Sequence, residues 1–215
     1  MSDEIELAAK SVGESVGALA ETSGVLGPVR ELADWVTSFI HYRRQPALAR
    51  QVSRAAEKIK ASGLPPAAIS DKLLRDLLEG GSKEDDETLQ ERWANLLANA
   101  MTEDSAPVRV AFTTILADLE PGEARLLDWM ADKADAAKAD DLLDEPMPSW
   151  VPPGGRDNLV RLMLLRRVEE QVDTKTLVLH GPPRVAGYTF TELGWEFLCA
   201  CRDPSPVNRH HRDPG

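Results

Sequence analysis

Cysteine is scarce in this sequence, and long apolar runs and a basic N-terminus are missing. Its 215 residues include two cysteines, Cys199 and Cys201, which are too few for a disulfide framework and suit a reducing compartment. The longest stretch free of Asp, Glu, Lys and Arg is ten residues, whereas a membrane-spanning helix needs about 20 apolar residues. Residues 1–6 are acidic where a secretory signal is basic. We therefore expect a folded, cytoplasmic protein with no transmembrane segment.

Recognisable catalytic motifs are missing as well. The chain contains no Gly-x-Ser-x-Gly, no Gly-rich loop ending in Gly-Lys-Ser or Gly-Lys-Thr, and no His-Glu-x-x-His. Cys199, Cys201, His210 and His211 resemble a loose metal-binding set, but side chains at i and i+2 of a helix point in nearly opposite directions. We expect Cys199 to be buried beside Trp195 and Cys201 to lie near the surface. The chain is thus expected to be no enzyme and to hold no metal or cofactor.

Acidic side chains outnumber basic ones by 36 to 25, which gives a net charge of −11. The two signs are unevenly distributed. Residues 28–60 carry seven basic and three acidic side chains, while residues 103–145 carry four basic and twelve acidic ones. An acidic body repels nucleic acid at long range, although one basic face can still bind phosphate.

The basic segment allows two interpretations. Its side chains share one helical face, provided that Pro46 does not break the helix: Arg43, Arg50, Arg54 and Lys58, with Arg44 nearby. Such a face could contact nucleic acid or an anionic lipid. The alternative is a solvated face paired with the acidic helices expected at 71–92 and 120–145, which a net charge of −11 favours.

Apolar side chains at helical spacing predict a mainly α fold. The predicted helices cover about 28–44, 46–62, 70–80, 84–100, 106–119 and a stretch from 121 onward. Trp35 lies on the apolar side of the first helix, and Gly80-Gly81 is expected to end the third.

The most strongly patterned helix follows an acidic cluster. Its apolar positions, which we expect to form the main core, are Leu89, Trp93, Leu96 and Leu97. The acidic residues 84–87 stand at its start, where carboxylates cap the helix and interact favourably with its dipole. A metal site there is the weaker alternative, because no histidine stands beside the cluster at ligand spacing.

After a Pro- and Gly-rich stretch at 146–155 the pattern changes. It predicts a helix over 159–168, strands over 176–180 and 185–190, and a last helix capped by Thr191 with Trp195 and Phe197 in the core. This order is typical of the end of a winged-helix module, although a clear second helix is missing. The leading helix carries basic residues that could read DNA, for which a packing role is the preferred interpretation: Arg156, Arg161, Arg166 and Arg167.

The segment from Glu84 to Ala100 resembles the signature of the abortive infection alpha (Abi-alpha) domain, an acidic pair followed by Leu-x-x-x-Trp-Ala-x-Leu-Leu-Ala. Three flanking landmarks agree in order: the Gly27-Pro28 helix start, the Leu-Pro-Pro turn at 64–66 and the hydrophobic stretch 112–127. The end of the chain, Tyr188–Cys199, resembles the family's Leu-Thr-x-x-Gly-x-x-Phe. The likeness covers about 25–201 and departs from the pattern at Gly80-Gly81-Ser82-Lys83. It implies bacterial or prophage-borne anti-phage defence and no known catalytic residue.

We therefore expect a multi-helix domain followed by a small winged-helix-like α+β lobe. The expected organisation is a helix or flexible arm at 1–27, the helical domain at 28–138, a linker at 139–155, the winged-helix-like lobe at 156–202 and a disordered tail at 203–215. The expected function is a non-enzymatic part of phage defence acting through a protein partner or a homo-oligomer. The alternatives are a nucleic-acid-binding regulator, using the basic helix 43–60 or the lobe, and a toxin enzyme with an unrecognised site.

Overall fold

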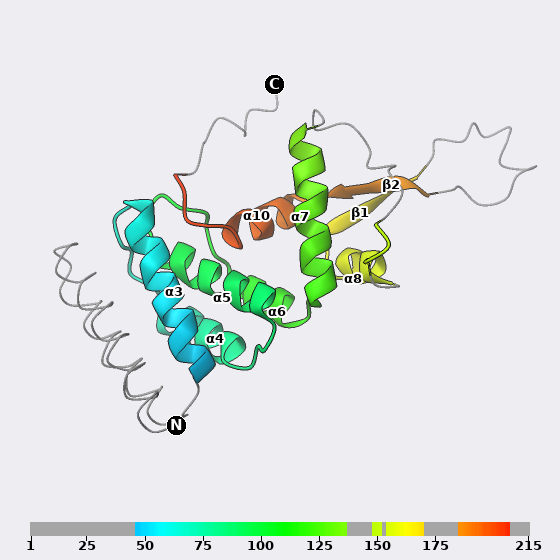
Figure 1. The fold of residues 1–215 in the computed structure, drawn as a ribbon. Helices are drawn as coiled ribbons and strands as arrows, with labels where there is room; N and C mark the ends of the chain where they lie inside the picture. Colours follow the sequence, from blue (N-terminus) through cyan, green and yellow to red (C-terminus); the bar gives the residue numbers. More distant parts are fainter. Residues whose placement is uncertain (1–45, 137–147, 152–153, 170–184, 207–215) are drawn as a thin grey trace, which may run out of the picture. The chain divides into compact units, whose positions relative to one another are not determined.

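The computed structural model describes residues 46–136, 148–151, 154–169 and 185–206 (Figure 1). Within these ranges the chain is mainly helical with one two-stranded antiparallel sheet, which confirms the predicted fold class. No helix in these ranges is long and apolar enough to cross a membrane. Trp35, Arg43, Arg44 and the predicted arm at 1–27 lie outside the described residues.

The described chain falls into two compact units. The first unit contains residues 46–118 together with 199–206, and the second contains the described part of 119–198. The boundaries expected from the sequence place residues 121–136 with the N-terminal helices, whereas this grouping places them with the C-terminal elements. The grouping and the expected domain limits thus differ for residues 121–136, and the expected limits stay a prediction.

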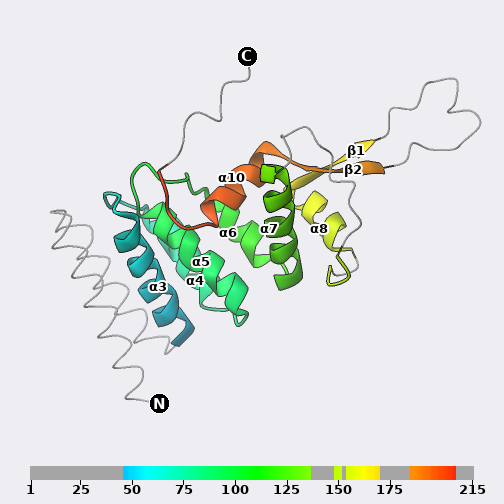
Figure 2. The ribbon, with the colours of Figure 1, turned by 45° about the horizontal axis from the view of Figure 1, so that its top comes forward.

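The first unit is built on four helices: α3 (Pro46–Ser62), α4 (Asp71–Gly81), α5 (Glu87–Ala100) and α6 (Val110–Ala117). Helices α3 and α4 lie beside α5 in both ribbon views (Figures 1 and 2). Proline is well tolerated at a helix start, because its missing N–H has no intrahelical partner there. Most of α5 is buried, including Leu89, Trp93, Leu96 and Leu97, each at most 2% exposed.

Two glycines at the end of α4 make room for α5 and α3. A Cβ atom on Gly80 would lie 2.1 Å from Cη2 of Trp93, and one on Gly81 would lie 2.3 Å from Oε1 of Gln51. Helix α4 does end at Gly81, but neither glycine has the left-handed backbone that a terminating glycine usually supplies. Their role is close packing against Trp93 and Gln51.

The second unit contains α7 (Pro121–Ala136), α8 (Gly155–Arg161), β1 (Leu165–Glu169), β2 (Val185–Phe190) and the beginning of α10 (Glu192–Ala200). The strands pair antiparallel, with Leu165 opposite Phe190 and Arg167 opposite Tyr188. The buried Glu123 carboxylate joins α7 to α8, since its Oε2 accepts from the backbone N–H of Glu120 at 2.9 Å and from Nδ2 of Asn158 at 2.7 Å.

The helix predicted over 159–168 is wrong at its C-terminal end. Helix α8 stops at Arg161, and Met163 takes a left-handed backbone with φ of 60°, after which residues 165–169 form β1. The apolar run at 162–165 fits a helix as well as a buried strand, so periodicity alone did not separate them. The return strand at 185–190 is confirmed, whereas the strand predicted at 176–180 lies outside the described residues.

Several residues at the start of α10 each have a separate structural role. Thr191 Oγ1 accepts from the N–H of Gly194 at 2.8 Å, which confirms the predicted cap. Gly194 is needed because a Cβ there would lie 2.0 Å from the carbonyl oxygen of Leu164. Phe197 is fully buried, while Trp195 is half-buried with its ring centroid 4.6 Å from that of Phe190.

The predicted burial of the two cysteines is wrong, because Cys199 is exposed and Cys201 is buried. The two thiols do point to different sides, as the helical spacing requires. The buried residues near the two cysteines are Phe197, Leu198, Ala200 and Cys201. The buried side of the chain here therefore includes Cys201 and not Cys199, the reverse of the prediction.

Candidate functional site

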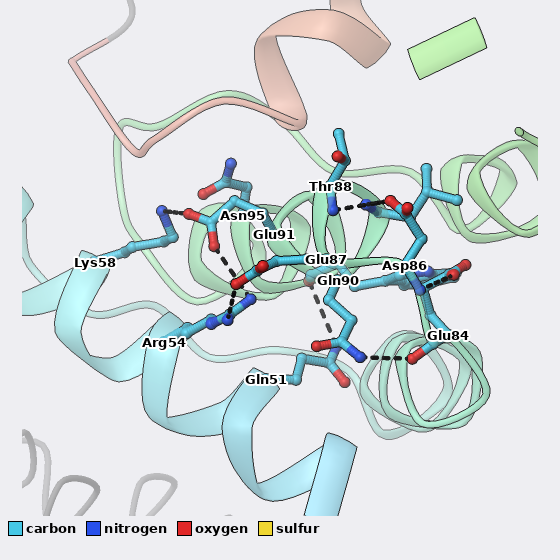
Figure 3. A network of polar contacts seen from close by, with 12 residues as sticks. Gln51, Arg54, Lys58, Glu84, Asp86, Glu87, Thr88, Gln90, Glu91 and Asn95 are labelled. Carbon is cyan, nitrogen blue, oxygen red and sulfur yellow. Dashed lines mark hydrogen bonds and ion pairs between the residues drawn. The ribbon is translucent and has the colours of Figure 1, made fainter. Parts of the chain in front are cut away.

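The basic side chains of α3 meet acidic side chains of α5 (Figure 3). Arg54 forms ion pairs with Glu87 through Nη2 at 3.1 Å and with Glu91 through Nη1 at 3.6 Å. Lys58 Nζ lies 2.5 Å from Oε1 of Glu91 and 2.5 Å from Oδ1 of Asp203. Two cations thus share three carboxylates along one seam, which we call the α3–α5 charge network (Arg54, Lys58, Glu87, Glu91 and Asp203).

For Arg54 and Lys58, this network fits the solvated-face interpretation of the basic segment, and both interpretations stay predictions. Arg54 and Lys58 pair within the first unit, as the solvated-face interpretation expects, and their partners on α5 come from the acidic stretch 71–92. Arg50 is exposed. The second acidic stretch expected to pair with the basic face, 120–145, forms α7 over its described part, and α7 belongs to the second unit.

The ammonium group of Lys58 is largely covered, with 15% of its side chain exposed. Burial lowers the pKa of Lys58, but hydrogen bonds and charge interactions with Asp203 and Glu91 outweigh it, so the pKa is raised above the ordinary lysine value of 10.5. The side chain therefore stays charged at neutral pH and remains bound to its two carboxylates.

The acidic cluster at 84–87 builds the start of α5. Asp86 Oδ1 accepts from the backbone N–H groups of Thr88 at 2.9 Å and Leu89 at 3.1 Å. Glu84 Oε1 accepts from the N–H of Asp86, and Gln90 Nε2 donates to the Glu84 carbonyl at 2.7 Å (Figure 3). Glu87 belongs to the charge network, so these acids act in capping and pairing. Among the described residues, no group of three His, Cys, Asp or Glu side chains could hold a metal ion.

Two buried asparagines of α5 hold residues 200–202, a role that the sequence analysis missed. Asn95 Nδ2 donates to the Cys201 carbonyl at 2.9 Å. Asn99 Nδ2 lies 3.0 Å from the Ala200 carbonyl and 2.8 Å from the Arg202 carbonyl. A helix leaves its last carbonyls without intrahelical donors, and these amides supply donors instead. The available signal was a pair of amides, four residues apart, in a helix that is otherwise largely apolar.

The segment after α10 therefore belongs to the first unit and is not the disordered tail expected from residue 203. Pro204 is buried, and Asp203 pairs with Lys58. Proline and a single aspartate carry no apolar periodicity, so composition alone suggested disorder. Residues 207–215 lie outside the described residues.

The second unit has a separate basic cluster on α8 and β1. Arg156 lies over the ring of Tyr188, with Cζ 5.0 Å from the ring centroid. Arg167, which pairs with Tyr188 across the sheet, places Nη2 2.6 Å from Oδ1 of Asp157. The carboxylate of Asp157 raises the pKa of the exposed Arg167 guanidinium above its usual range. Arg161 is exposed and donates from Nε to Oδ1 of Asn158 at 2.8 Å.

Comparison with known proteins identifies the helical part of the chain. The family model described as "Abortive infection alpha" matches residues 43–146. The match includes the Trp93 helix and the charged side chains of α3, while residues 25–42 and 147–201 of the predicted likeness lie outside it. Searches of curated proteins and of solved structures give no match. Residues 43–146, just under half of the chain, are therefore similar to the abortive infection alpha family.

Proposed function

We propose that this protein is a non-enzymatic component of anti-phage defence by abortive infection. It acts in the bacterial cytoplasm by contact with a protein partner or with further copies of itself. The family match over residues 43–146 is the observation that carries the defence role.

The α3–α5 charge network argues against contact with nucleic acid at the paired cations of α3. Arg54 and Lys58 already face Glu87, Glu91 and Asp203. A phosphate would have to displace these carboxylates or bind beside them, where their negative charge repels it. Arg54 and Lys58 are therefore poor candidates for contacts to a nucleic-acid backbone.

The defence role is tested by infecting bacteria that carry the gene. We expect the culture to survive at a low ratio of phage to cells and to stop growing without releasing phage at a high ratio. Trp93→Ala, which removes the centre of the first unit, serves as the inactive control, and Lys72→Ala on the exposed side of α4 serves as the active one. Normal phage release from cells that carry the intact protein would refute the defence role.

The contact mechanism is tested by the size of the protein before and after infection. We expect a complex larger than one chain whose size changes on infection, and we expect surface variants that prevent the complex to lose protection as well. A toxin enzyme behaves differently. A single exposed Asp, Glu or His substitution would then abolish protection while fold and assembly stay intact, and that result would refute the non-enzymatic mechanism.

A further inference from the structure

Helix α8 and strand β1 of the second unit carry several arginines close together in the sequence. Residues 155–168 contain four arginines and one acid, Asp157. All four arginines are exposed. Residues 155–168 thus carry more basic than acidic side chains, with Glu169 following at the end of β1, although the whole chain is acidic.

Strand geometry divides these arginines between two sides of the sheet. Successive residues of a strand point to opposite faces, so Arg166 and Arg167 do not share one. Arg167 is on the face of Tyr188, its cross-strand partner, and Arg156 lies over that same ring. Arg161 follows Asp157 by one helical turn on α8, and Asp157 binds Arg167. One continuous surface thus carries Arg156, Arg161, Arg167 and Tyr188, while Arg166 lies on the opposite face of β1.

We propose that this surface, Arg156, Arg161, Arg167 and Tyr188, binds single-stranded nucleic acid. Guanidinium groups match phosphate oxygens in geometry and charge, and they keep their charge at every physiological pH. The half-buried Tyr188 ring already carries Arg156 on one side, and an unpaired base can extend such a tyrosine–arginine stack because arginine itself stacks on bases. Asp157 and Tyr188 both hydrogen-bond to the Arg167 guanidinium, so a phosphate would bind the remaining donors of Arg167 beside the Asp157 carboxylate, and Arg156 and Arg161 supply further positive charge.

The test uses the full-length protein and fluorescent 20-nucleotide single strands of random sequence, both DNA and RNA, with a DNA duplex of the same length for comparison. We expect binding that weakens as salt rises and that favours the single strands. The triple variant Arg156→Ala, Arg161→Ala, Arg167→Ala should bind at least about tenfold more weakly, with a salt slope smaller by about 2. Tyr188→Ala should lose about tenfold and Tyr188→Phe very little, because the phenylalanine keeps the ring.

Arg166→Ala is the matched control, since it removes the same charge from an exposed position of the same strand on the other face. We expect its affinity to stay within about twofold of the parent. Equal losses for Arg166→Ala and Arg167→Ala would refute a defined surface, and so would equal binding of duplex and single strand. Binding to anionic phospholipid vesicles without binding to the oligonucleotides would refute the nucleic-acid assignment. Thermal melting of every variant shows that the second unit remains folded, and none of these results depends on phage protection.

Discussion

Trp93 of α5 fills the space that the missing side chain of Gly80 leaves on α4, since a Cβ atom on Gly80 would stand 2.1 Å from Cη2 of the indole. The contact is to the rigid ring of a side chain that is 1% exposed, so the ring has little room to move away. The two residues therefore have to be considered together: the largest buried side chain of the first unit depends on the smallest residue of its neighbouring helix.

Gly80→Ala is expected to destabilise the first unit by about 1–3 kcal/mol, because the new methyl group overpacks the core against Trp93. The measurement is urea denaturation followed by circular dichroism. Trp93→Phe provides the control background: the smaller ring makes room for the methyl group, so Gly80→Ala should cost clearly less there. Strict additivity of the two substitutions would show that they do not touch.

Trp93→Ala is expected to lower the free energy of unfolding by about 3–5 kcal/mol, because it leaves a large cavity in a closed core. That loss is a large share of the stability of a typical domain. An unchanged melting temperature would contradict the burial of the indole.

Asn99→Ala is expected to cost about 2–3 kcal/mol, since it removes the donor that serves the carbonyls of Ala200 and Arg202 and leaves buried acceptors unsatisfied. Asn99→Asp should cost more, because it sets a negatively charged acceptor against the same carbonyls. Hydrogen exchange should show faster opening of residues 199–206 in both variants. Normal protection of this segment would contradict the role of Asn99.

Lys58→Met is expected to lose about 0.2–1 kcal/mol of stability near neutral pH, the usual range for partly exposed ion pairs. The pKa of Lys58 is raised in the folded protein, so its contribution is fully present below the unfolded value of 10.5 and is lost as pH rises through the folded value. The difference between parent and variant should therefore shrink above pH 10.5. Lys72→Met, which removes the same charge from a side chain that is 72% exposed, should cost less stability than Lys58→Met near neutral pH.

Gly194→Ala is expected to destabilise the second unit by about 1–3 kcal/mol, because its Cβ would collide with a backbone oxygen that cannot rotate away. Differential scanning calorimetry should show a lowered transition for this unit. Thr191→Ala should cost about 1 kcal/mol through loss of the cap, and Thr191→Ser should keep it. A melting curve for Gly194→Ala that matches the parent would contradict the close approach to Leu164.

Local patterns predicted most of the described helices. The spacing of Leu89, Trp93, Leu96 and Leu97 marks the buried side of α5, and Thr191 marks the start of α10, because both depend on residues close in sequence. The sequence analysis predicted a helix at 165–169, where the structure has β1. The strand was missed because it depends on pairing with β2, which begins 20 residues after β1 begins.

In the candidate site, too, the features that depend on local sequence were predicted and those that depend on distant residues were missed. Helical spacing placed Arg54 and Lys58 on one face and indicated acidic partners on the helix at 71–92. The third carboxylate, Asp203, was not predictable, since it lies 145 residues from Lys58 in the sequence. The donors of Asn95 and Asn99 were missed for the same reason, because their acceptors are backbone carbonyls that any residue at 200–202 would supply.

The grip of Asn95 and Asn99 on residues 200–202 also sets the order of events during synthesis. Residues 46–118 leave the ribosome long before the last turn of α10. The amides of Asn95 and Asn99 can therefore form these hydrogen bonds only after about a hundred further residues have been synthesised. A nascent chain without residues 199–206 would lack the carbonyls of residues 200–202 and would expose these two amides of α5 to water. We expect such a chain to be degraded faster than one in which this segment is in place.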